Sequence, residues 1–161
     1  MAKNTTNNKK QNNNSIKIIS VNKKARFNYE INDVYEAGIV LEGSEVKSIR
    51  AGHISLTESF VFIRNNEVFL KNAYIKPYEN SSAYTPDSKR TRKLLLKKQE
   101  ILKLKHKLDA MGYTIIPLKV YIKNNLVKIE IGLGKGKKLY DKRETIKKRT
   151  IERDIARHIN T

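Results

Sequence analysis

The chain has 161 residues, with 34 Lys and Arg against 16 Asp and Glu, a formal net charge of +18 and a pI near 10.0. It has no cysteine, which excludes a disulfide framework, a thiolate nucleophile and a cysteine-based zinc site. The sequence has no apolar run near the roughly 18 residues that span a bilayer, and it has no secretory signal. We therefore expect a cytoplasmic protein with a polyanionic partner, and the charge favours nucleic acid.

Three regions differ in composition. Residues 1–15 are polar and rich in Asn, and we expect them to be disordered because they bury too little apolar surface to offset the entropy of ordering. Residues 16–134 carry the periodic apolar content and are predicted to form one packed domain. Residues 135–161 form a basic tail, which like-charge repulsion should keep poorly ordered in the free protein.

The predicted domain begins with two strand candidates, 25–31 and 35–41, and a short helix between glycines over 43–52. Two hairpins are expected over 59–71 and 114–133, because β-branched and aromatic runs flank an Asn-Asn pair in each. Pro117, in the second hairpin, cannot donate a sheet hydrogen bond and should lie at an edge, a strand start or a bulge.

One long helix is predicted from Thr91 to Met111, because Leu94, Ile101 and Leu108 recur every seven residues and Gly112 can terminate it. The cations of 89–93 then lie at a helix start, where they oppose the helix dipole. An anionic partner explains those cations better than local stability does. Cations on the rest of the polar face are interpreted as solvated.

The last predicted strand alternates, with Val127, Ile129 and Ile131 on one face and polar residues on the other. Short strands with few helices predict a mainly β protein. The expected fold is a closed antiparallel six-stranded barrel of the oligonucleotide-binding type, with two or three flanking helices and a basic C-terminal tail. Such barrels present a strand face and loops to RNA.

The sequence offers no pattern for catalysis. The three histidines show no metal-ligand spacing, and no G-x-S-x-G elbow is present. The segment GLGKGKK lacks the Walker spacing, so its glycines are interpreted as letting the strand end turn and letting backbone approach phosphates. We expect neither an enzyme nor a cofactor or metal.

Four segments resemble one family when they are taken together: NKKARFNYEI, YEAGIVLEGSEVKSIRAG, SKRTRKLLL and KVYIKNNLVKIEIGLGKGKKLYDKRETIKKR. The resemblance is to the bacterial tmRNA-binding proteins, also called the SsrA-binding or small protein B family, and covers about residues 18 to 153. It implies a barrel of the oligonucleotide-binding type. It also implies binding to the tRNA-like domain of tmRNA and its delivery, with the elongation factor Tu and GTP, to stalled ribosomes for trans-translation.

The resemblance also implies site residues. Glu36, Leu95 and Lys128 match family positions that are implicated in RNA binding or well placed for a phosphate. From the residues alone, Glu36 is a partner for a nearby cation and Leu95 is core. Further cations of the resembling segments complete the predicted RNA-binding set: Arg26, Lys47, Lys89, Arg90 and Arg92.

The tail matches the family segment that enters the decoding region of the ribosome. The predicted tail contacts are Lys135, Lys137, Lys138, Tyr140, Asp141, Lys142, Arg143, Lys147, Lys148 and Arg149. Residues from Glu144 onward are competent helix formers, and Ile151, Ile155 and Ile159 recur every four residues. We expect the tail to become a helix in the empty mRNA channel, where rRNA phosphates neutralise its charge. From the residues alone, a solvated charge run is the favoured interpretation of the tail.

Three positions depart from residues common in the family. Phe27 replaces a frequent His, Ser44 replaces a frequent Trp, and Tyr140 stands where His is common before Asp-Lys-Arg. A tyrosine can stack on a base, which contributes about 1–3 kcal/mol, but it cannot take up a proton near neutral pH.

Two other function classes stay open. A ribosomal or rRNA-binding structural protein would carry a similar basic tail, and stall-dependent ribosome association would distinguish the two. An RNA-modifying enzyme would need a constellation that is not evident in the sequence. We expect a monomer.

Overall fold

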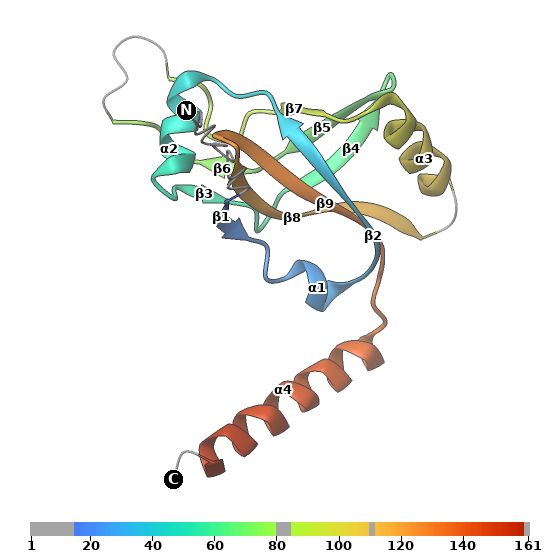
Figure 1. The fold of residues 1–161 in the computed structure, drawn as a ribbon. Helices are drawn as coiled ribbons and strands as arrows, with labels where there is room; N and C mark the ends of the chain where they lie inside the picture. The colour runs from blue at the N-terminus through green and yellow to red at the C-terminus, as the bar shows by residue number, and fades with distance from the viewer. Residues whose placement is uncertain (1–14, 80–84, 110–111, 160–161) are drawn as a thin grey trace, which may run out of the picture.

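The computed structural model describes residues 15–79, 85–109 and 112–159 of the chain (Figure 1). The predicted disorder of 1–15 lies almost entirely outside the described residues. The strands are β1 (Ile16–Val21), β2 (Tyr29–Ile39), β3 (Ile54–Ser55), β4 (Phe60–Arg64), β5 (Glu67–Lys71), β6 (Tyr74–Ile75), β7 (Arg92–Leu95), β8 (Tyr113–Lys123) and β9 (Leu126–Gly136). The helices are α1 (Ala25–Asn28), α2 (Gly43–Arg50), α3 (Lys98–Leu108) and α4 (Leu139–Ile159).

Six strands pair in an antiparallel ring, in the order β8–β4–β5–β7–β2–β9, and β9 pairs back with β8. Strand β1 pairs with β8 outside the ring, and β3 and β6 form a separate two-stranded sheet. Helices α2 and α3 lie at opposite ends of the ring, and α4 extends away from it beyond α1 (Figure 1). The prediction of a mainly β protein with a few helices is confirmed.

Both predicted hairpins are confirmed, and their turns lie at the Asn-Asn pairs. Asn65 and Asn66 have φ of 51° and 59°, and Asn124 and Asn125 have φ of 51° and 62°. Two consecutive residues at positive φ give the turn whose twist matches the flanking strands. The register of β8 against β9 shifts just after Pro117, which confirms the expected irregularity there.

The helix predicted from Thr91 to Met111 is wrong over residues 91–97 and right from Lys98 to Leu108. Residues Arg92–Leu95 are strand β7, and the helix begins at Lys98. The inward side chains of β7 are Arg92 and Leu94, which alternate as a strand requires. The seven-residue recurrence of Leu94 with the helix is therefore coincidental.

Two other expectations need correction. The candidate strand over 25–31 is split, because its first four residues form α1 and only the rest belongs to β2. The second candidate, 35–41, is the continuation of β2 rather than a separate strand. The short strands β1, β3 and β6 were not predicted. The expected helix over 43–52 is confirmed as α2, and its Ile49 is fully buried.

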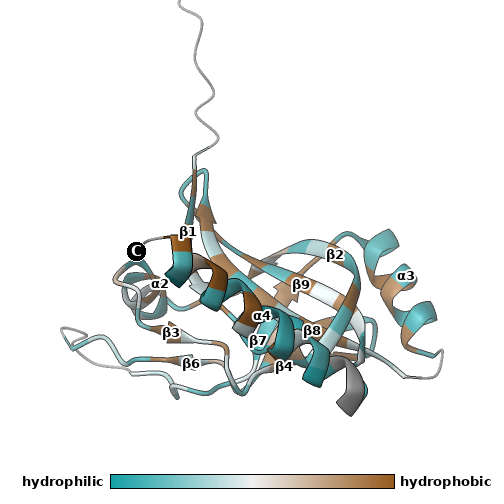
Figure 2. Ribbon diagram, turned by 90° about the horizontal axis from the view of Figure 1, so that it is seen from below, coloured by the Kyte–Doolittle hydropathy of each residue, from teal (hydrophilic) through white to brown (hydrophobic). Residues whose placement is uncertain are grey.

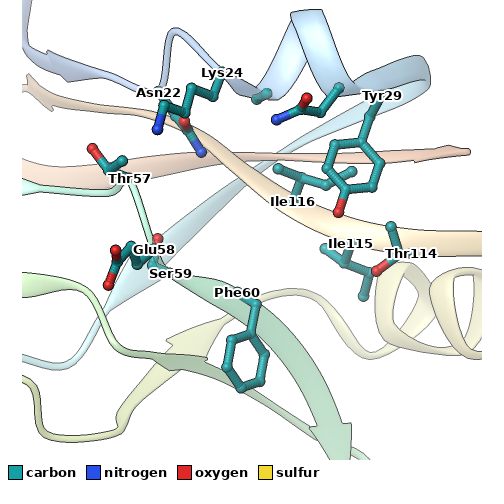
Figure 3. A pocket seen from close by; sticks show the side chains of 12 residues that line it. Asn22, Lys24, Tyr29, Thr57, Glu58, Ser59, Phe60, Thr114, Ile115 and Ile116 are labelled. Carbon is teal, nitrogen blue, oxygen red and sulfur yellow. The ribbon is translucent and has the colours of Figure 1, made fainter. Parts of the chain in front are cut away.

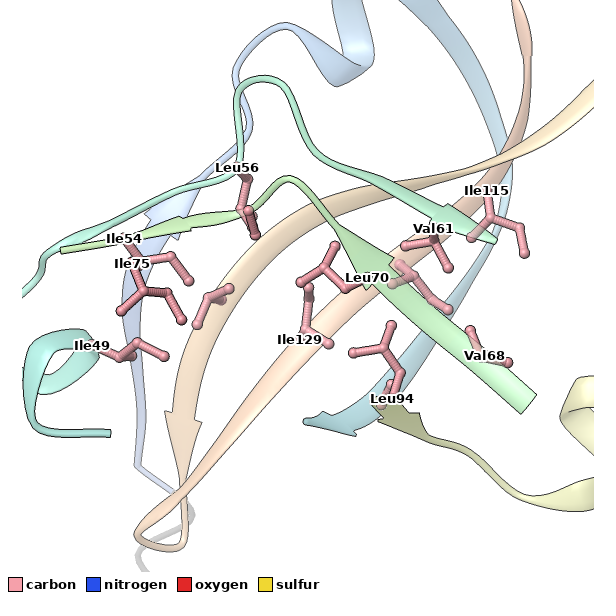
Figure 4. Close-up of a cluster of buried hydrophobic side chains, with 14 of the residues drawn as sticks. Ile49, Ile54, Leu56, Val61, Val68, Leu70, Ile75, Leu94, Ile115 and Ile129 are labelled. Carbon is pink, nitrogen blue, oxygen red and sulfur yellow. The ribbon is translucent and has the colours of Figure 1, made fainter. Parts of the chain in front are cut away.

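The core fills the inside of the ring and the space under α2 (Figure 4). Its β9 members, Ile129 and Ile131, alternate with the outward Lys128 and Glu130, as the sequence predicts. Gly134 makes β2 and β9 approach closely, because a Cβ there would lie 2.3 Å from the Glu30 carbonyl oxygen. By contrast, α4 mixes polar and apolar residues along its length (Figure 2).

Candidate nucleic-acid interface

A row of paired residues crosses the outer face of β7, β2, β9 and β8. Leu95 pairs with Gly38, Gly38 pairs with Lys128, and Lys128 pairs with Tyr121. Directly paired residues share a face of the sheet, so the row places two predicted site residues, Leu95 and Lys128, on one surface. We call the row and Glu36, two residues before Gly38, the candidate face.

Leu95 is 53% exposed, although periodicity alone assigns it to the core. It lies over Gly38, where an added Cβ would come within 3.3 Å of the Leu95 Cβ. The glycine thus leaves room for the leucine to lie against the sheet while one side remains open. An exposed aliphatic side chain held in this way can pack against a base or ribose.

Glu36 is tied to two side chains of β8. The Tyr121 hydroxyl donates a hydrogen bond to the Glu36 carboxylate, and the Lys123 ammonium lies 3.4 Å from Glu36 Oε2. The hydrogen bond from Tyr121 is the main cause that lowers the pKa of Glu36, and the charges of Lys123 and Lys128 add to it. Burial, with help from Glu36, raises the pKa of Tyr121. Glu36 is therefore an anion that orients a tyrosine and a lysine.

Lys128 is the cation of this face that is left for a phosphate. Among the residues that the structure describes, it forms no ion pair, whereas its neighbour Glu130 lies 3.7 Å from the Lys119 ammonium. Lys119 also lies over the Tyr121 ring, 5.8 Å from its centroid. The two acidic residues on this side of the sheet, Glu36 and Glu130, thus form their ion pairs with Lys123 and Lys119.

Arg92, a predicted RNA contact, is not on this surface. Its side chain is fully buried, and its Nε donates a 2.6 Å hydrogen bond to Oε2 of Glu45, which is 3% exposed. Its Nη1 donates to the Ala73 carbonyl at 2.9 Å. A buried guanidinium with these partners holds β7 against α2 and cannot reach a phosphate, so this residue leaves the predicted set.

Arg90 completes the same network from the turn before β7. Its Nε donates to Glu45 Oε1 at 3.0 Å, and its side chain is 27% exposed. Burial alone would raise the pKa of Glu45, but the hydrogen bonds from Arg90, the Glu42 backbone and Arg92 outweigh it and lower that pKa. Arg90 is therefore mainly structural. The explanation of this cation cluster by an anionic partner outside the protein is wrong for Arg92, whose anion is Glu45, and it stays a prediction for the partly exposed Arg90.

Four further predicted cations, three of the domain and Lys135 of the tail, are exposed. Lys89 is exposed beside the Asp87 turn, and Lys47 lies over the Tyr78 ring at 5.3 Å. Arg26 is exposed on α1, and Lys135 lies over the Tyr113 ring at 4.6 Å. They come from four places in the fold, namely α2, the turn before β7, α1 and β9.

The tail leaves the sheet beside α1 and continues as a helix. The Lys137 N–H donates to the Asn28 carbonyl at 2.8 Å, and the Arg149 guanidinium lies 5.8 Å from the Phe27 ring centroid. The predicted tail cations that the structure exposes or half-exposes are Lys137, Lys138, Lys142, Arg143, Lys147, Lys148 and Arg149. The side chains of Tyr140 and Asp141 lie outside those described.

The tail helix presents a stripe of exposed apolar side chains. Ile146, Ile151, Ile155 and Ile159 are each more than half exposed. The described part of the chain contains no cluster of His, Asp and Glu that could hold a metal ion. Its helices are also too short or too polar to cross a membrane.

Sequence reasoning missed Tyr121, Lys123 and the burial of Glu45. The first two follow from strand alternation once the register of β8 is known, because they share the outward face with Lys119. The burial of Glu45 has a weaker signal, namely a carboxylate three residues into a predicted helix, where it forms a capping box with Glu42.

The fold and the face define a small β-ring protein with exposed cations and a cationic helical arm, an arrangement typical of proteins that bind nucleic acid. The chain belongs to the SmpB protein family, whose model matches residues 19–161. It is 54% identical over 142 residues to the SsrA-binding protein of Streptococcus mutans serotype c, covering 88% of this chain and 92% of that one. It is 56% identical over 142 residues to the SsrA-binding protein of Persephonella marina, covering 88% and 93%.

A solved structure supports the same assignment. A chain of the structure described as "tmRNA-SmpB: a journey to the center of the bacterial ribosome" aligns with a TM-score of 0.64 and 44% identity. The alignment covers 79% of this chain and 93% of that one. The resemblance expected from the sequence is thereby confirmed.

Proposed function

We propose that this protein binds the tRNA-like domain of tmRNA and brings it to stalled ribosomes for trans-translation, as a non-enzymatic adaptor in the cytoplasm. The single observation that carries the proposal is the candidate face, where an exposed leucine, a lysine without an ion pair among the described residues and a nearly buried tyrosine lie in one row. The names of the relatives, SsrA-binding protein, support the choice of RNA.

The ring of six strands is interpreted as a closed barrel of the oligonucleotide-binding type, which commonly binds nucleic acid on a strand face. Residues 16–134 then form the RNA-binding unit, although the structure continues β9 to Gly136. In this proposal Glu36 positions Tyr121 and Lys123, Leu95 packs against a base or ribose, and Lys128 meets a phosphate. Arg26, Lys47 and Lys89 give further long-range attraction to the RNA.

The tail from residue 135 is proposed to act on the ribosome. Its cations would meet rRNA phosphates in the decoding region, and its helix would occupy the empty mRNA channel. The exposed isoleucines of α4 support this division, since they find no apolar layer within the described protein. Disorder of this segment in the free protein, a monomeric state and indirect contact with elongation factor Tu through tmRNA are parts of the same proposal.

Binding of purified protein to two RNAs tests the function. The tRNA-like domain of tmRNA should bind at least tenfold more tightly than an elongator tRNA at the same salt concentration, because affinity must be compared at fixed salt. Equal affinity for both RNAs, together with ribosome association at fixed stoichiometry in unstalled cells, would instead favour a ribosomal structural protein.

A further inference from the structure

A cleft of about 560 Å³ lies at the edge of the candidate face, where β1 and the start of α1 meet the tail helix. Its size falls within the range of ordinary ligand sites. Its apolar wall is made by Ile18 and Val21 of β1 and by Leu118 of β8. Ile18 and Val21 are 54% and 53% exposed, so their side chains are open to a partner.

The rim of the cleft is positively charged. Lys23 lines it from the turn before α1, Arg26 from α1, Lys119 from β8 and Arg149 from the tail helix. One acid, Glu130, also lines it, and its carboxylate lies 3.7 Å from the Lys119 ammonium. Three cations therefore remain beside an apolar wall. This combination suits a nucleotide, whose base is apolar on both faces and whose phosphate is anionic.

The cleft continues the candidate face along the same sheet. Tyr121, the last residue of the row, pairs with Ile18 on β1, and Lys119 pairs with Val21. Neighbouring strands lie about 4.8 Å apart, so an RNA that contacts Lys128 reaches Ile18 two strands further on. The cleft is therefore within reach of the RNA that the face is proposed to bind.

Another pocket does not suit the same ligand. It has a volume of about 240 Å³ and lies between α1, β8 and the start of β4 (Figure 3). Its charged lining residues are one cation, Lys24, and one anion, Glu58. Without an excess of positive charge it has no reason to attract a phosphate.

We propose that the cleft binds one unpaired nucleotide of the RNA that lies on the candidate face. The base packs on Ile18, Val21 and Leu118, and the phosphate lies among Lys23, Arg26 and Arg149. Because Arg149 belongs to α4, the bound nucleotide also holds the tail helix beside the sheet. This inference rests on the proposed function, and it adds a second contact that the face alone does not include.

Photo-crosslinking of the full chain tests the cleft. The probe is a tRNA-like domain transcript that contains 4-thiouridine or 6-thioguanosine, and trypsin digestion locates the crosslinks. We expect a crosslink in the peptide Ile18–Lys23, which follows the cleavage site at Lys17.

Affinity measurements supply the second readout. The double variant Ile18→Ser with Val21→Ser should bind the transcript about five- to tenfold more weakly, because the base loses the apolar surface of two side chains that it would bury. Ile16→Ser is the matched control, because Ile16 is 53% exposed on the same strand but does not line the cleft. It should bind within about twofold of the unchanged protein. Thermal melting of each variant checks that it is folded.

The outcomes separate the two proposals. Crosslinks confined to the peptides of β7 and β9, with equal binding by the double variant and the Ile16 control, would overturn the cleft and leave the face intact. A transcript that binds the unchanged protein no better than an unrelated hairpin RNA would overturn the proposed function itself. If the cleft binds a peptide or a lipid instead of RNA, the tryptic fragment Ile18–Lys23 should carry no RNA crosslink, which would also overturn the proposal.

Discussion

The same residue type has opposite surroundings in the two halves of this molecule. Ile129 and Ile131 of β9 are fully buried, whereas Ile151 and Ile155 of α4 are more than half exposed. Strand alternation points the first pair into a ring that six strands complete, and α4 has no such layer in the described protein. The body therefore folds by burial of its own side chains, and the exposed isoleucines agree with the proposal that the tail gains its contacts from a partner.

Removal of the tail should separate RNA binding from tagging on the ribosome, and this is the largest effect that we expect. A chain that ends after Lys138 keeps all of β9 and the Lys137–Asn28 hydrogen bond. We expect it to bind the tRNA-like domain nearly as well as the full chain and to lose peptide tagging on stalled ribosomes altogether. Filter binding and a reconstituted tagging assay measure the two properties. Loss of RNA binding together with tagging would show that the division between body and tail is wrong.

The salt dependence of RNA binding should show which part of the molecule contacts the phosphates. If about six to ten phosphates are neutralised, the affinity of the full chain for RNA falls about 10³–10⁵-fold between roughly 50 and 200 mM salt. The chain that ends after Lys138 should show a slope smaller by about 1, because Arg149 is the one residue of the tail to which we assign a phosphate contact of free tmRNA. A titration series for both chains measures this, and a flat response would contradict a charge-led interface.

Core and tail isoleucines should differ in their effect on stability. Ile129→Ala should lower the free energy of unfolding by about 2–5 kcal/mol, because it leaves a cavity in the ring. Ile151→Ala is the matched control and should change it by less than about 0.5 kcal/mol, because the side chain is exposed. Chemical denaturation measures both. A large loss for the control would mean that α4 packs as part of the body.

The candidate face should respond to the loss of a single charge. Lys128→Gln should weaken RNA binding uniformly across RNAs and reduce the salt slope by about 1, as expected for one phosphate contact. Lys103→Gln, an exposed lysine of α3, serves as the control and should leave the slope unchanged. If both variants behave alike, Lys128 contributes only to the general field of the protein.

The smallest expected effect is the dependence of stability on pH. The pKa of Glu36 is lowered in the folded protein, chiefly by the hydrogen bond from Tyr121, so its contribution is present above the unfolded pKa near 4.5. That contribution is lost as the pH falls through the lower folded pKa. Glu36→Gln should therefore reduce the difference in melting temperature between about pH 6 and pH 3. Solvent screening keeps the effect small, because Glu36 is 40% exposed.

The sequence predicts those features of the fold that depend on residues close together in the chain. The two Asn-Asn turns and the irregularity at Pro117 follow from backbone preferences of single residues. The sequence wrongly predicts a helix over β7, because Leu94 lies seven residues before Ile101 and so matches the seven-residue spacing of Ile101 and Leu108 in α3. The break between them, at Leu96 and Lys97, carries no proline or glycine to mark it.

The candidate site depended on pairings that no local pattern contains. Glu36 and Tyr121 are 85 residues apart, and Glu45 and Arg92 are 47 apart. Residue type alone therefore predicts the same role, a contact with RNA, for Arg92 and for Lys128. The register of the ring places one of them inside and the other on the face, which decides whether a charge stabilises the fold or is free to meet RNA.

The most direct test of the account is recovery of the tagged protein from cells, followed by sequencing of the RNA bound to it. The account predicts strong enrichment of tmRNA over tRNA and rRNA for the full chain, and the same enrichment for the chain that ends after Lys138. Recovery of bulk rRNA at fixed stoichiometry, without enrichment of tmRNA, would contradict it and identify a structural component of the ribosome.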